Sequence, residues 1–274
     1  MFEEILKNVR ENGSFVHSIT NYVTANDCAN IILACGGSPI MADDILEVEE
    51  ITSLCNALVI NIGTLNERTI NSMIIAGKKA NELKHPVILD PVGIGASRLR
   101  TETVLRLFKE VNFTVIRGNA SEIKAIDNGI GNTKGVDADT SDFITEDNLD
   151  ATVAFAQKLS ERMNSVIVIT GAIDIVVDRR KVYVIRNGHP MMSKITGTGC
   201  MLTALIGAYC GANPEEPADA SAAAVCSMGI CGELAYKRIT QNDEGTASLR
   251  VHLIDYISKL DKDLLARYAK AEVR

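Results

Sequence analysis

The chain has 274 residues, 46% of them hydrophobic and 23% charged, and its formal net charge is −7. This composition is typical of a globular protein, and the negative charge without a long Lys/Arg run argues against a nucleic-acid partner. No stretch of about 18 uncharged apolar residues occurs, so we expect no membrane span. Seven cysteines without paired spacing fit the reducing cytoplasm, and four histidines without ligand spacing predict no structural zinc.

Apolar periodicity predicts helices that alternate with strands along most of the chain. The expected helices cover residues 3–11, 29–34, 43–56, 66–83, 101–111, 120 onward, 149–163, 200–210, 217–238 and 246–270. The first expected strand begins at residue 16, and the others cover 38–41, 57–63, 86–93, 113–116, 165–171, 173–178 and 182–185. Residues 128–146, rich in Gly, Asp and Thr, predict a flexible, solvent-facing segment. The alternation indicates a single α/β domain over 1–274, with a mostly parallel central sheet and helices on both faces.

Glycines and threonines precede a long apolar run at residues 194–208, which predicts a loop that opens into a buried helix. The first backbone N–H groups of such a helix lack partners, so this geometry favours a bound anion, most often a phosphate. Gly197 and Gly199 would let the backbone approach the phosphate oxygens. Cys200 falls in the first helical turn, where we expect the pKa of its thiol to be lowered. The alternative is a glycine turn that caps a core helix, with Cys200 as a small hydrophobic residue.

The segment from Asn21 to Asn30 is unusually rich in small polar side chains. Asn26 and Asn30 lie one helical turn apart, so they share a face with the Asn21 end. Two interpretations of this segment stay open. It is either a network of satisfied helix caps or a site that recognises a small neutral ligand by hydrogen bonds.

Three predicted strands end in chemically active residues, and ligands bind at the carboxyl ends of the strands in an open parallel sheet. Asp90 follows one strand, Arg117 follows another with Glu122 close behind, and Thr170 follows a third. Carboxylates such as those of Asp90 and Glu122 suit Mg²⁺, and the Arg117 guanidinium suits phosphate oxygens. With the 197–200 loop they make up the parts of a phosphoryl-transfer site. Taken singly, Asp90 is also consistent with a turn, Arg117 with a surface ion pair and Glu122 with an acid at a helix N-terminus.

The chain has no Gly-x-x-x-x-Gly-Lys-[Ser/Thr] motif and no protein-kinase signature, and its Gly-rich loop comes too late for a dinucleotide-binding Rossmann enzyme. Six motifs in unbroken order resemble the hydroxyethylthiazole kinase family, a branch of the ribokinase-like fold. They are residues 16–21, 37–41, 61–64, 88–93, 117–122 and 196–200. The resemblance implies phosphorylation of the primary alcohol of 4-methyl-5-(2-hydroxyethyl)thiazole by ATP with Mg²⁺, in thiamine biosynthesis or salvage. It also implies a homotrimer with the thiazole site at the subunit interface.

The resemblance further implies roles for individual residues. Met41 and Gly197 match substrate-contacting positions, and we place Asn21 with them. Cys200 stands where the wider superfamily has an aspartate base, so it is the expected catalytic residue near the substrate hydroxyl. The residues expected to contact ATP are Arg117, Thr170 and Gly199. The acids expected on the magnesium side are Asp90 and Glu122.

Departures from the family pattern are small. Thr198 stands where Ala is common, and Ala172 stands where an acid usually follows the glycine. Three other functions are considered: a kinase for another small alcohol such as hydroxymethylpyrimidine, a dehydratase on the same fold that repairs hydrated nicotinamide nucleotides, and a non-catalytic nucleotide-binding regulator. The dehydratase would be expected to carry Asp at position 200 and to lack the Asn-rich segment.

Overall fold

The computed structural model describes residues 1–131 and 144–274. Its strands are β1 (Phe15–Ile19), β2 (Ser38–Ile40), β3 (Ala57–Asn61), β4 (Val87–Asp90), β5 (Val115–Asn119), β6 (Val166–Thr170), β7 (Asp174–Val177), β8 (Val182–Ile185) and β9 (Ala271–Val273). Within the described residues they form one sheet in the order β2-β1-β3-β4-β5-β6-β7-β8-β9. The strands from β2 to β6 in this order pair in parallel, and those from β6 to β9 pair antiparallel. The prediction of a mostly parallel sheet is therefore confirmed.

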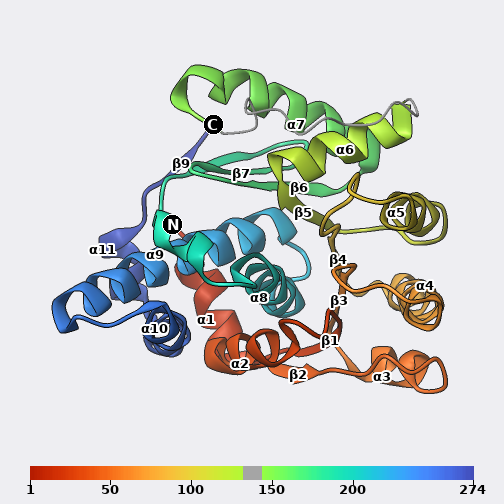
Figure 1. Ribbon diagram of the computed structural model, residues 1–274, viewed down its shortest axis with the longest axis horizontal. Coiled ribbons are helices and arrows are strands. Elements are labelled where there is room, and N and C mark those ends of the chain that lie inside the picture. Colours follow the sequence, from red (N-terminus) through yellow and green to blue (C-terminus); the bar gives the residue numbers. More distant parts are fainter. Residues whose placement is uncertain (132–143) are drawn as a thin grey trace.

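Helices cover both faces of this sheet. They are α1 (Glu3–Asn12), α2 (Ala25–Cys35), α3 (Val48–Leu54), α4 (Glu67–Glu82), α5 (Arg98–Glu110), α6 (Ala120–Gly131), α7 (Leu149–Met163), α8 (Thr198–Ala212), α9 (Pro217–Asn242), α10 (Thr246–Lys259) and α11 (Lys262–Tyr268), with 3₁₀ turns η2 (Glu146–Asn148) and η3 (Pro190–Lys194). Helices α3 to α7 pack on one face, while α1, α2 and α8 to α10 pack on the other (Figure 1). Such layers follow from parallel strands, because each crossover has to return over one face of the sheet.

Each face of the sheet has its own apolar core, because successive side chains of a strand point in opposite directions. In β3, Ala57 and Val59 belong to the core that α8 covers, and Leu58 and Ile60 belong to the core under α3 to α7. Gly207 lets α8 lie directly on the sheet, since a Cβ there would be 2.4 Å from Val59 Cγ2. Burial on both sides explains why this strand reads as a continuous apolar run.

The predicted start of the third helix is wrong. It was expected to be capped by Asp43, but α3 begins at Val48. The carboxylates of Asp43 and Asp44 instead lie 3.5 and 3.0 Å from the Arg68 guanidinium of α4. Asp44 Oδ1 also accepts a hydrogen bond from Leu46 N, which holds the segment in a turn.

The C-terminal region also differs from the prediction of one helix over 246–270. Helix α10 ends at Lys259, and Leu264 N donates a hydrogen bond to Asp261 Oδ1 to start α11. The chain then pairs as β9 with β8, with Val273 opposite Tyr183. The predicted flexible segment 128–146 begins within α6 and ends in η2, and its residues 132–143 lie outside the described residues.

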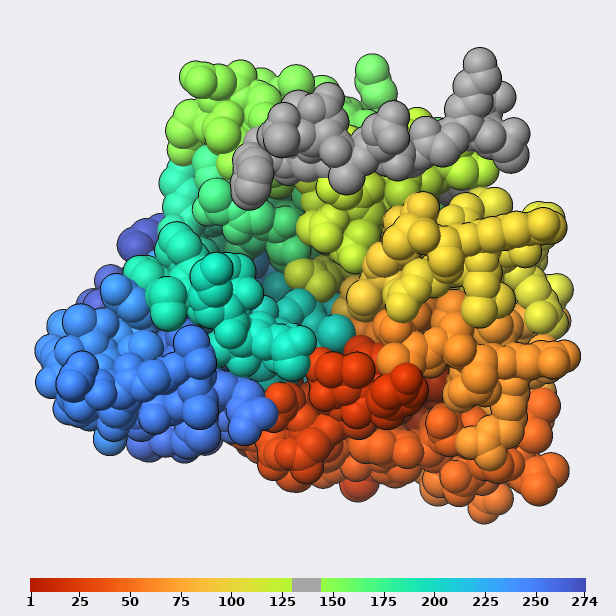
Figure 2. All heavy atoms as spheres, viewed as in Figure 1, coloured from red at the N-terminus to blue at the C-terminus, as the bar shows by residue number. Residues whose placement is uncertain are grey.

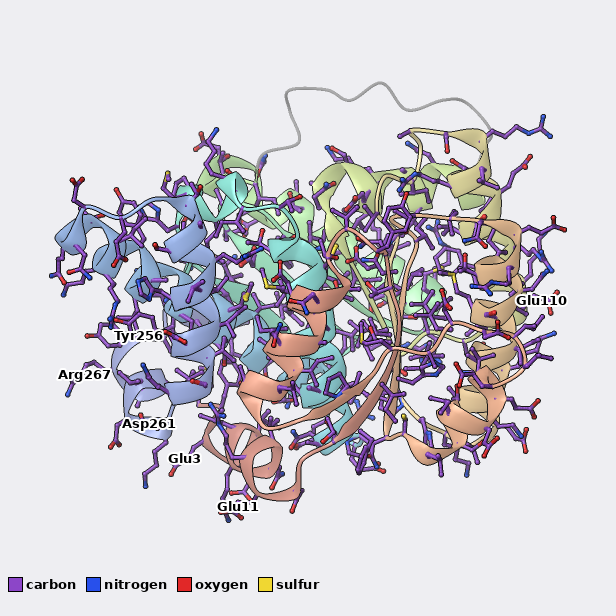
Figure 3. All side chains as sticks on the ribbon, turned by 60° about the horizontal axis from the view of Figure 1, so that its bottom comes forward. Glu3, Glu11, Glu110, Tyr256, Asp261 and Arg267 are labelled. Carbon is purple, nitrogen blue, oxygen red and sulfur yellow. The ribbon has the colours of Figure 1, made fainter. Side chains whose placement is uncertain are left out.

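The surface carries the charged side chains. Glu3, Glu110 and Arg267 project outward from the helices (Figure 3). No helix in the described part of the chain is both long and apolar enough to cross a bilayer. The seven cysteines are free thiols, and six of them are buried in the cores or at their borders.

Candidate active site

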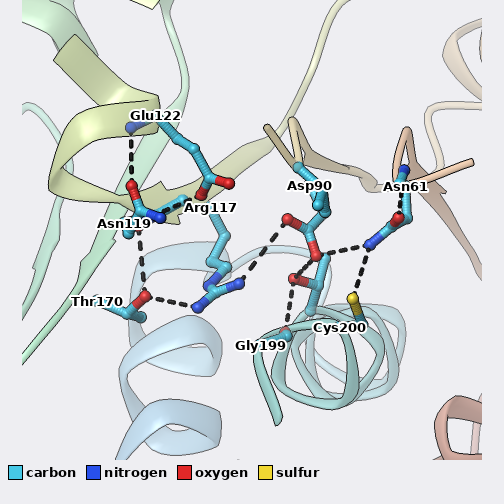
Figure 4. A network of polar contacts seen from close by, with 12 residues as sticks. Asn61, Asp90, Arg117, Asn119, Glu122, Thr170, Gly199 and Cys200 are labelled. Carbon is cyan, nitrogen blue, oxygen red and sulfur yellow. Dashed lines mark hydrogen bonds and ion pairs between the residues drawn. The ribbon is translucent and has the colours of Figure 1, made fainter. Parts of the chain in front are cut away.

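Segments far apart in the sequence meet at the carboxyl edge of the parallel strands. There β4 ends at Asp90, β5 carries Arg117 and β6 ends at Thr170, and α8 begins beside them (Figure 4). The N-terminal segments, drawn in red, and the teal segment that leads into α8 lie side by side on one face of the molecule (Figure 2). The sheet topology thus brings together the residues that were predicted from the ends of the strands.

The first turn of α8 presents backbone N–H groups toward this edge. Gly197 is the N-cap residue with φ 86°, and no side chain caps the helix start. A Cβ on Gly197 would lie 2.4 Å from Thr24 Cγ2, so glycine is required there by space as well as by φ. Because Met201 N makes the first hydrogen bond back to Gly197 O, the amides of residues 198–200 are left for a ligand. This arrangement suits an anion.

Arg117 lies over this turn. Its guanidinium donates from Nη2 to Thr170 Oγ1 at 2.5 Å, and its Nη1 is 3.8 Å from Asp90 Oδ1. The side chain is 11% exposed. A Cβ on Gly199 would lie 2.5 Å from Arg117 Nη1, so the guanidinium packs directly on the backbone of the loop. The Arg117 guanidinium (the Arg117 clamp) and the loop at residues 197–200, both predicted to bind phosphate, are therefore in contact.

Asp90 is fully buried between this clamp and α8. Its Oδ2 accepts hydrogen bonds from Asn61 Nδ2 at 2.8 Å and from Thr203 Oγ1 at 2.9 Å. Its Oδ1 is buried without a hydrogen-bond partner. Burial raises the pKa of the Asp90 carboxyl to about 6, although the charge of Arg117 opposes this shift. The carboxyl thus has one oxygen with capacity for a further ligand.

Glu122 is held at the start of α6 by backbone groups. Its two oxygens accept hydrogen bonds from Gly93 N and Asn119 N, each at 2.9 Å, and Asn119 Oδ1 accepts one from Glu122 N at 2.8 Å. Each carboxylate oxygen keeps a second lone pair. In the described residues no three His, Cys, Asp or Glu side chains form a metal cage. Mg²⁺ does not need one, because it commonly binds one or two carboxylates together with waters and phosphates.

Cys200 lies half-buried beside two asparagines. Asn21 Nδ2 and Asn61 Nδ2 both donate to its Sγ at 3.3 Å. The prediction of a lowered thiol pKa is wrong: burial, and then the negative charge of Asp90, raise the pKa of Cys200. Hydrogen bonding with Thr24, and then with Asn21 and Asn61, opposes the shift but does not reverse it. Tertiary burial therefore outweighs the favourable position at the start of a helix.

Asn21 has partners at both ends of its carboxamide. Its Oδ1 accepts hydrogen bonds from Val23 N, Thr24 N and Thr24 Oγ1, each at 3.1 Å. Its Nδ2 donates to Asn61 Oδ1 at 3.0 Å as well as to Cys200. These bonds fix the turn before α2, whose N-cap residue Thr24 makes no side-chain cap hydrogen bond, so they do not decide between the two open interpretations.

Met41 takes no part in the hydrogen bonds described above. It follows the edge strand β2, and its side chain is 37% exposed. Several other large apolar side chains of the first 54 residues are also exposed, including Tyr22 and Leu46.

Three polar residues of the site were missed in the sequence analysis. Asn61 pairs with Asp90 in the sheet register, and Thr203 lies one turn after Gly199 on α8. Asp174 accepts a hydrogen bond from Gly171 N at 2.9 Å, and burial raises the pKa of its carboxyl to about 7. A polar residue that ends an apolar strand, as Asn61 does, was the available signal.

Comparison with known proteins agrees with the motifs. A family model described as the hydroxyethylthiazole kinase family matches residues 6–263. A hydroxyethylthiazole kinase from Clostridium acetobutylicum is 60% identical over 272 residues, which are 99% of each chain. The structure of a hydroxyethylthiazole kinase protein from Pyrococcus horikoshii is 35% identical with a TM-score of 0.89, and the match covers 100% of this chain and 98% of that one. A ribokinase-like superfamily protein from Enterococcus faecalis, 13% identical with a TM-score of 0.63 over 94% and 89% of the two chains, shares the fold alone. The chain described here belongs to the hydroxyethylthiazole kinase family.

Proposed function

We propose that the protein transfers the γ-phosphoryl group of ATP to the primary hydroxyl of 4-methyl-5-(2-hydroxyethyl)thiazole, in thiamine biosynthesis or salvage. One observation carries the proposal: Cys200 lies in the uncapped first turn of α8, next to Gly199, whose backbone packs against the Arg117 guanidinium. The activity for which its relatives are named supports the same substrate. The dehydratase alternative expects Asp at position 200, where this chain has Cys.

The ATP side of the site is assigned to Arg117, Thr170 and Gly199. The guanidinium is a planar donor that suits phosphate oxygens, and Thr170 fixes its orientation through the 2.5 Å hydrogen bond. The amide of Gly199 is one of the three at the start of α8 that have no helical partner. Donors that are already oriented stabilise the charge of the transferring group without a reorganisation cost.

The acceptor side is assigned to Cys200, Gly197, Asn21 and Met41. In the transfer, the substrate oxygen forms a bond to Pγ, the bond from Pγ to the β-phosphate oxygen breaks, and ADP leaves with that electron pair. The hydroxyl proton passes to an oxygen of the transferred phosphoryl group. A loose transition state needs positioning more than a strong base. Because the pKa of the Cys200 thiol is raised, we assign this residue to accept a hydrogen bond from the hydroxyl and to orient it.

Asp90 and Glu122 would hold Mg²⁺ if it binds with the nucleotide. The orphaned Oδ1 of Asp90 and the unused lone pairs of Glu122 are the oxygen donors that this cation prefers. When bound, the ion would neutralise charge on the phosphates. Arg117 and the amides of α8 act on the same phosphates from the protein side.

We also propose a cytoplasmic homotrimer with the thiazole site at the subunit interface. The β2 end of the sheet carries exposed apolar side chains, which are typical of an interaction surface. They are Phe15, Tyr22, Val23, Leu33, Met41, Ile45, Leu46 and Leu54. An interface on this surface would account for a substrate role of Met41, and free thiols support the cytoplasm. Sedimentation of Leu46→Asp, compared with Leu99→Asp on α5, tests it: only the first should dissociate.

A coupled assay that measures ADP release tests the activity itself. The panel contains the thiazole alcohol, hydroxymethylpyrimidine and a hydrated nicotinamide nucleotide, each with Mg²⁺ and with EDTA. We expect turnover with the thiazole alcohol and a strong loss in EDTA. Faster turnover of hydroxymethylpyrimidine would favour the other kinase, and ADP release tied to repair of the hydrated nucleotide would favour the dehydratase. ATP binding without turnover of any compound would favour a regulator.

A further inference from the structure

The side chain of Asn61 uses all of its hydrogen-bonding capacity within the site. It is buried at the end of β3, next to Asp90 in the sheet register. Its Nδ2 donates to Asp90 Oδ2 at 2.8 Å and to Cys200 Sγ at 3.3 Å. Its Oδ1 accepts from Asn21 Nδ2 at 3.0 Å and from Gly63 N at 2.8 Å. A carboxamide has two N–H donors and two lone pairs, and all four are used here.

These partners fix the orientation of the carboxamide. If the group were flipped, its oxygen would face the Asp90 carboxylate and its nitrogen would face Gly63 N–H, and both contacts would be repulsive. Both asparagine amides that reach Cys200 Sγ are donors, so the sulfur is held as an acceptor by Asn21 and Asn61 together. Figure 4 shows Asn61 bonded to both Asp90 and Cys200.

We propose that Asn61 is a positioning residue for phosphoryl transfer: its amide fixes Cys200 Sγ relative to Asp90 and so places the acceptor hydroxyl. The inference rests on the proposed function, since it assigns Cys200 to the hydroxyl. Asn61 itself need not touch either substrate. Its loss should therefore lower kcat and leave the KM for ATP nearly unchanged.

Asn61→Ala removes all four hydrogen bonds, and Asn61→Asp keeps the volume but replaces the donor with an acceptor that faces Asp90. Asn213→Ala is the matched control. Asn213 is a buried asparagine at the far end of α8, where its side chain bonds Asn8 and the carbonyl of Tyr209. Its hydrogen bonds go to Ile5, Asn8 and Tyr209, none of which belongs to the site.

The experiment measures kcat, both KM values and the melting temperature of each variant with the thiazole alcohol. We expect kcat to fall at least tenfold in both Asn61 variants, with less than a threefold change in the KM for ATP. Asn213→Ala should lower the melting temperature and keep kcat. If Asn61→Ala is too unstable to assay, the isosteric Asn61→Asp decides by the same criteria.

A double-mutant cycle separates positioning from a merely structural effect. In the Cys200→Ala background, Asn61→Ala should cost less than threefold in kcat, because its target is gone. An equal loss in both backgrounds, or a kcat of Asn61→Ala equal to that of Asn213→Ala, overturns the inference. The wild type is assayed alongside: failure to phosphorylate the thiazole alcohol overturns the proposed function and this inference with it, whereas a failed cycle with an active wild type overturns the inference alone.

Discussion

Gly199→Ala tests whether the close contact between Arg117 and the start of α8 serves ATP. A Cβ at this position would lie 2.5 Å from Nη1 and 3.0 Å from Nη2 of the guanidinium. Ordinary contact begins at 3.4 Å, so Nη1 has to move by about 0.9 Å, from 2.5 to 3.4 Å. Gly199 lies within a helix, where alanine is favoured over glycine by about 1 kcal/mol. The substitution therefore moves the clamp without strain in the backbone.

The expected loss of activity follows from the displacement of the guanidinium and from the hydrogen bond to phosphate that it would weaken. A displacement of about 1 Å at a reacting group can cost roughly 100-fold in rate. A hydrogen bond to a charged group is worth about 1.5–3 kcal/mol, which corresponds to roughly 10- to 150-fold. We expect kcat/KM for ATP to fall about 10- to 100-fold in Gly199→Ala. The melting temperature should shift by no more than about 2–4 °C, the equivalent of about 1 kcal/mol in a chain of this size.

The assay varies ATP at a saturating concentration of the thiazole alcohol and follows ADP release. Gly245→Ala is the control, because a Cβ there meets no atom within 4 Å. It should leave kcat/KM for ATP unchanged. An unchanged kcat/KM in Gly199→Ala would show that the guanidinium finds an equally good position, and the reasoning would be refuted. A fall in melting temperature of more than about 8 °C would refute it too, since the contact would then support the fold.

Three further predictions concern the chemistry of the site. Cys200→Ala should lower kcat about 10- to 100-fold and spare the affinity for ATP, measured by calorimetry; an unchanged kcat would remove Cys200 from the mechanism. Arg117→Ala should lower kcat about 100- to 1000-fold with a smaller effect on thiazole affinity, measured by the same kinetics and by titration. Burial raises the pKa of Asp90 to about 6, so protonation removes the charge of this carboxylate below that pH. The kcat/KM for ATP should therefore fall as the pH drops through about 6. A flat profile from pH 8 to 5 would contradict this.

The strand ends of the site could be predicted from the sequence because a general rule of parallel sheets applied to them. Once β4, β5 and β6 are recognised as neighbouring parallel strands, Asp90, Arg117 and Thr170 have to lie at the same edge. The buried strands read clearly because both of their faces are covered. No knowledge of long-range contacts was needed for this part.

Features that depend on contacts distant in sequence were not predictable in the same way. The three residues of β9 are too few to predict a strand, and their pairing with β8 depends on how α10 and α11 turn the chain back. The turn before α3 combines the local bond between Leu46 N and Asp44 Oδ1 with ion pairs to Arg68, more than 20 residues away. The sign of the Cys200 pKa shift depends on burial and on Asp90, which lies on another strand.

The negative charges of the described site disfavour the binding of a triphosphate without a cation. Asp90 and Asp174 both interact with the Arg117 guanidinium, and Glu122 adds its negative charge to Asp90. The pKa values of the two aspartates are raised to about 6 and about 7, because burial without sufficient positive charge disfavours their ionised forms. A triphosphate brings further negative charge to this edge, and one guanidinium with a few backbone amides cannot balance it. We therefore expect ATP to bind together with a divalent cation, since the same ion would relieve the carboxylates and the phosphates at once.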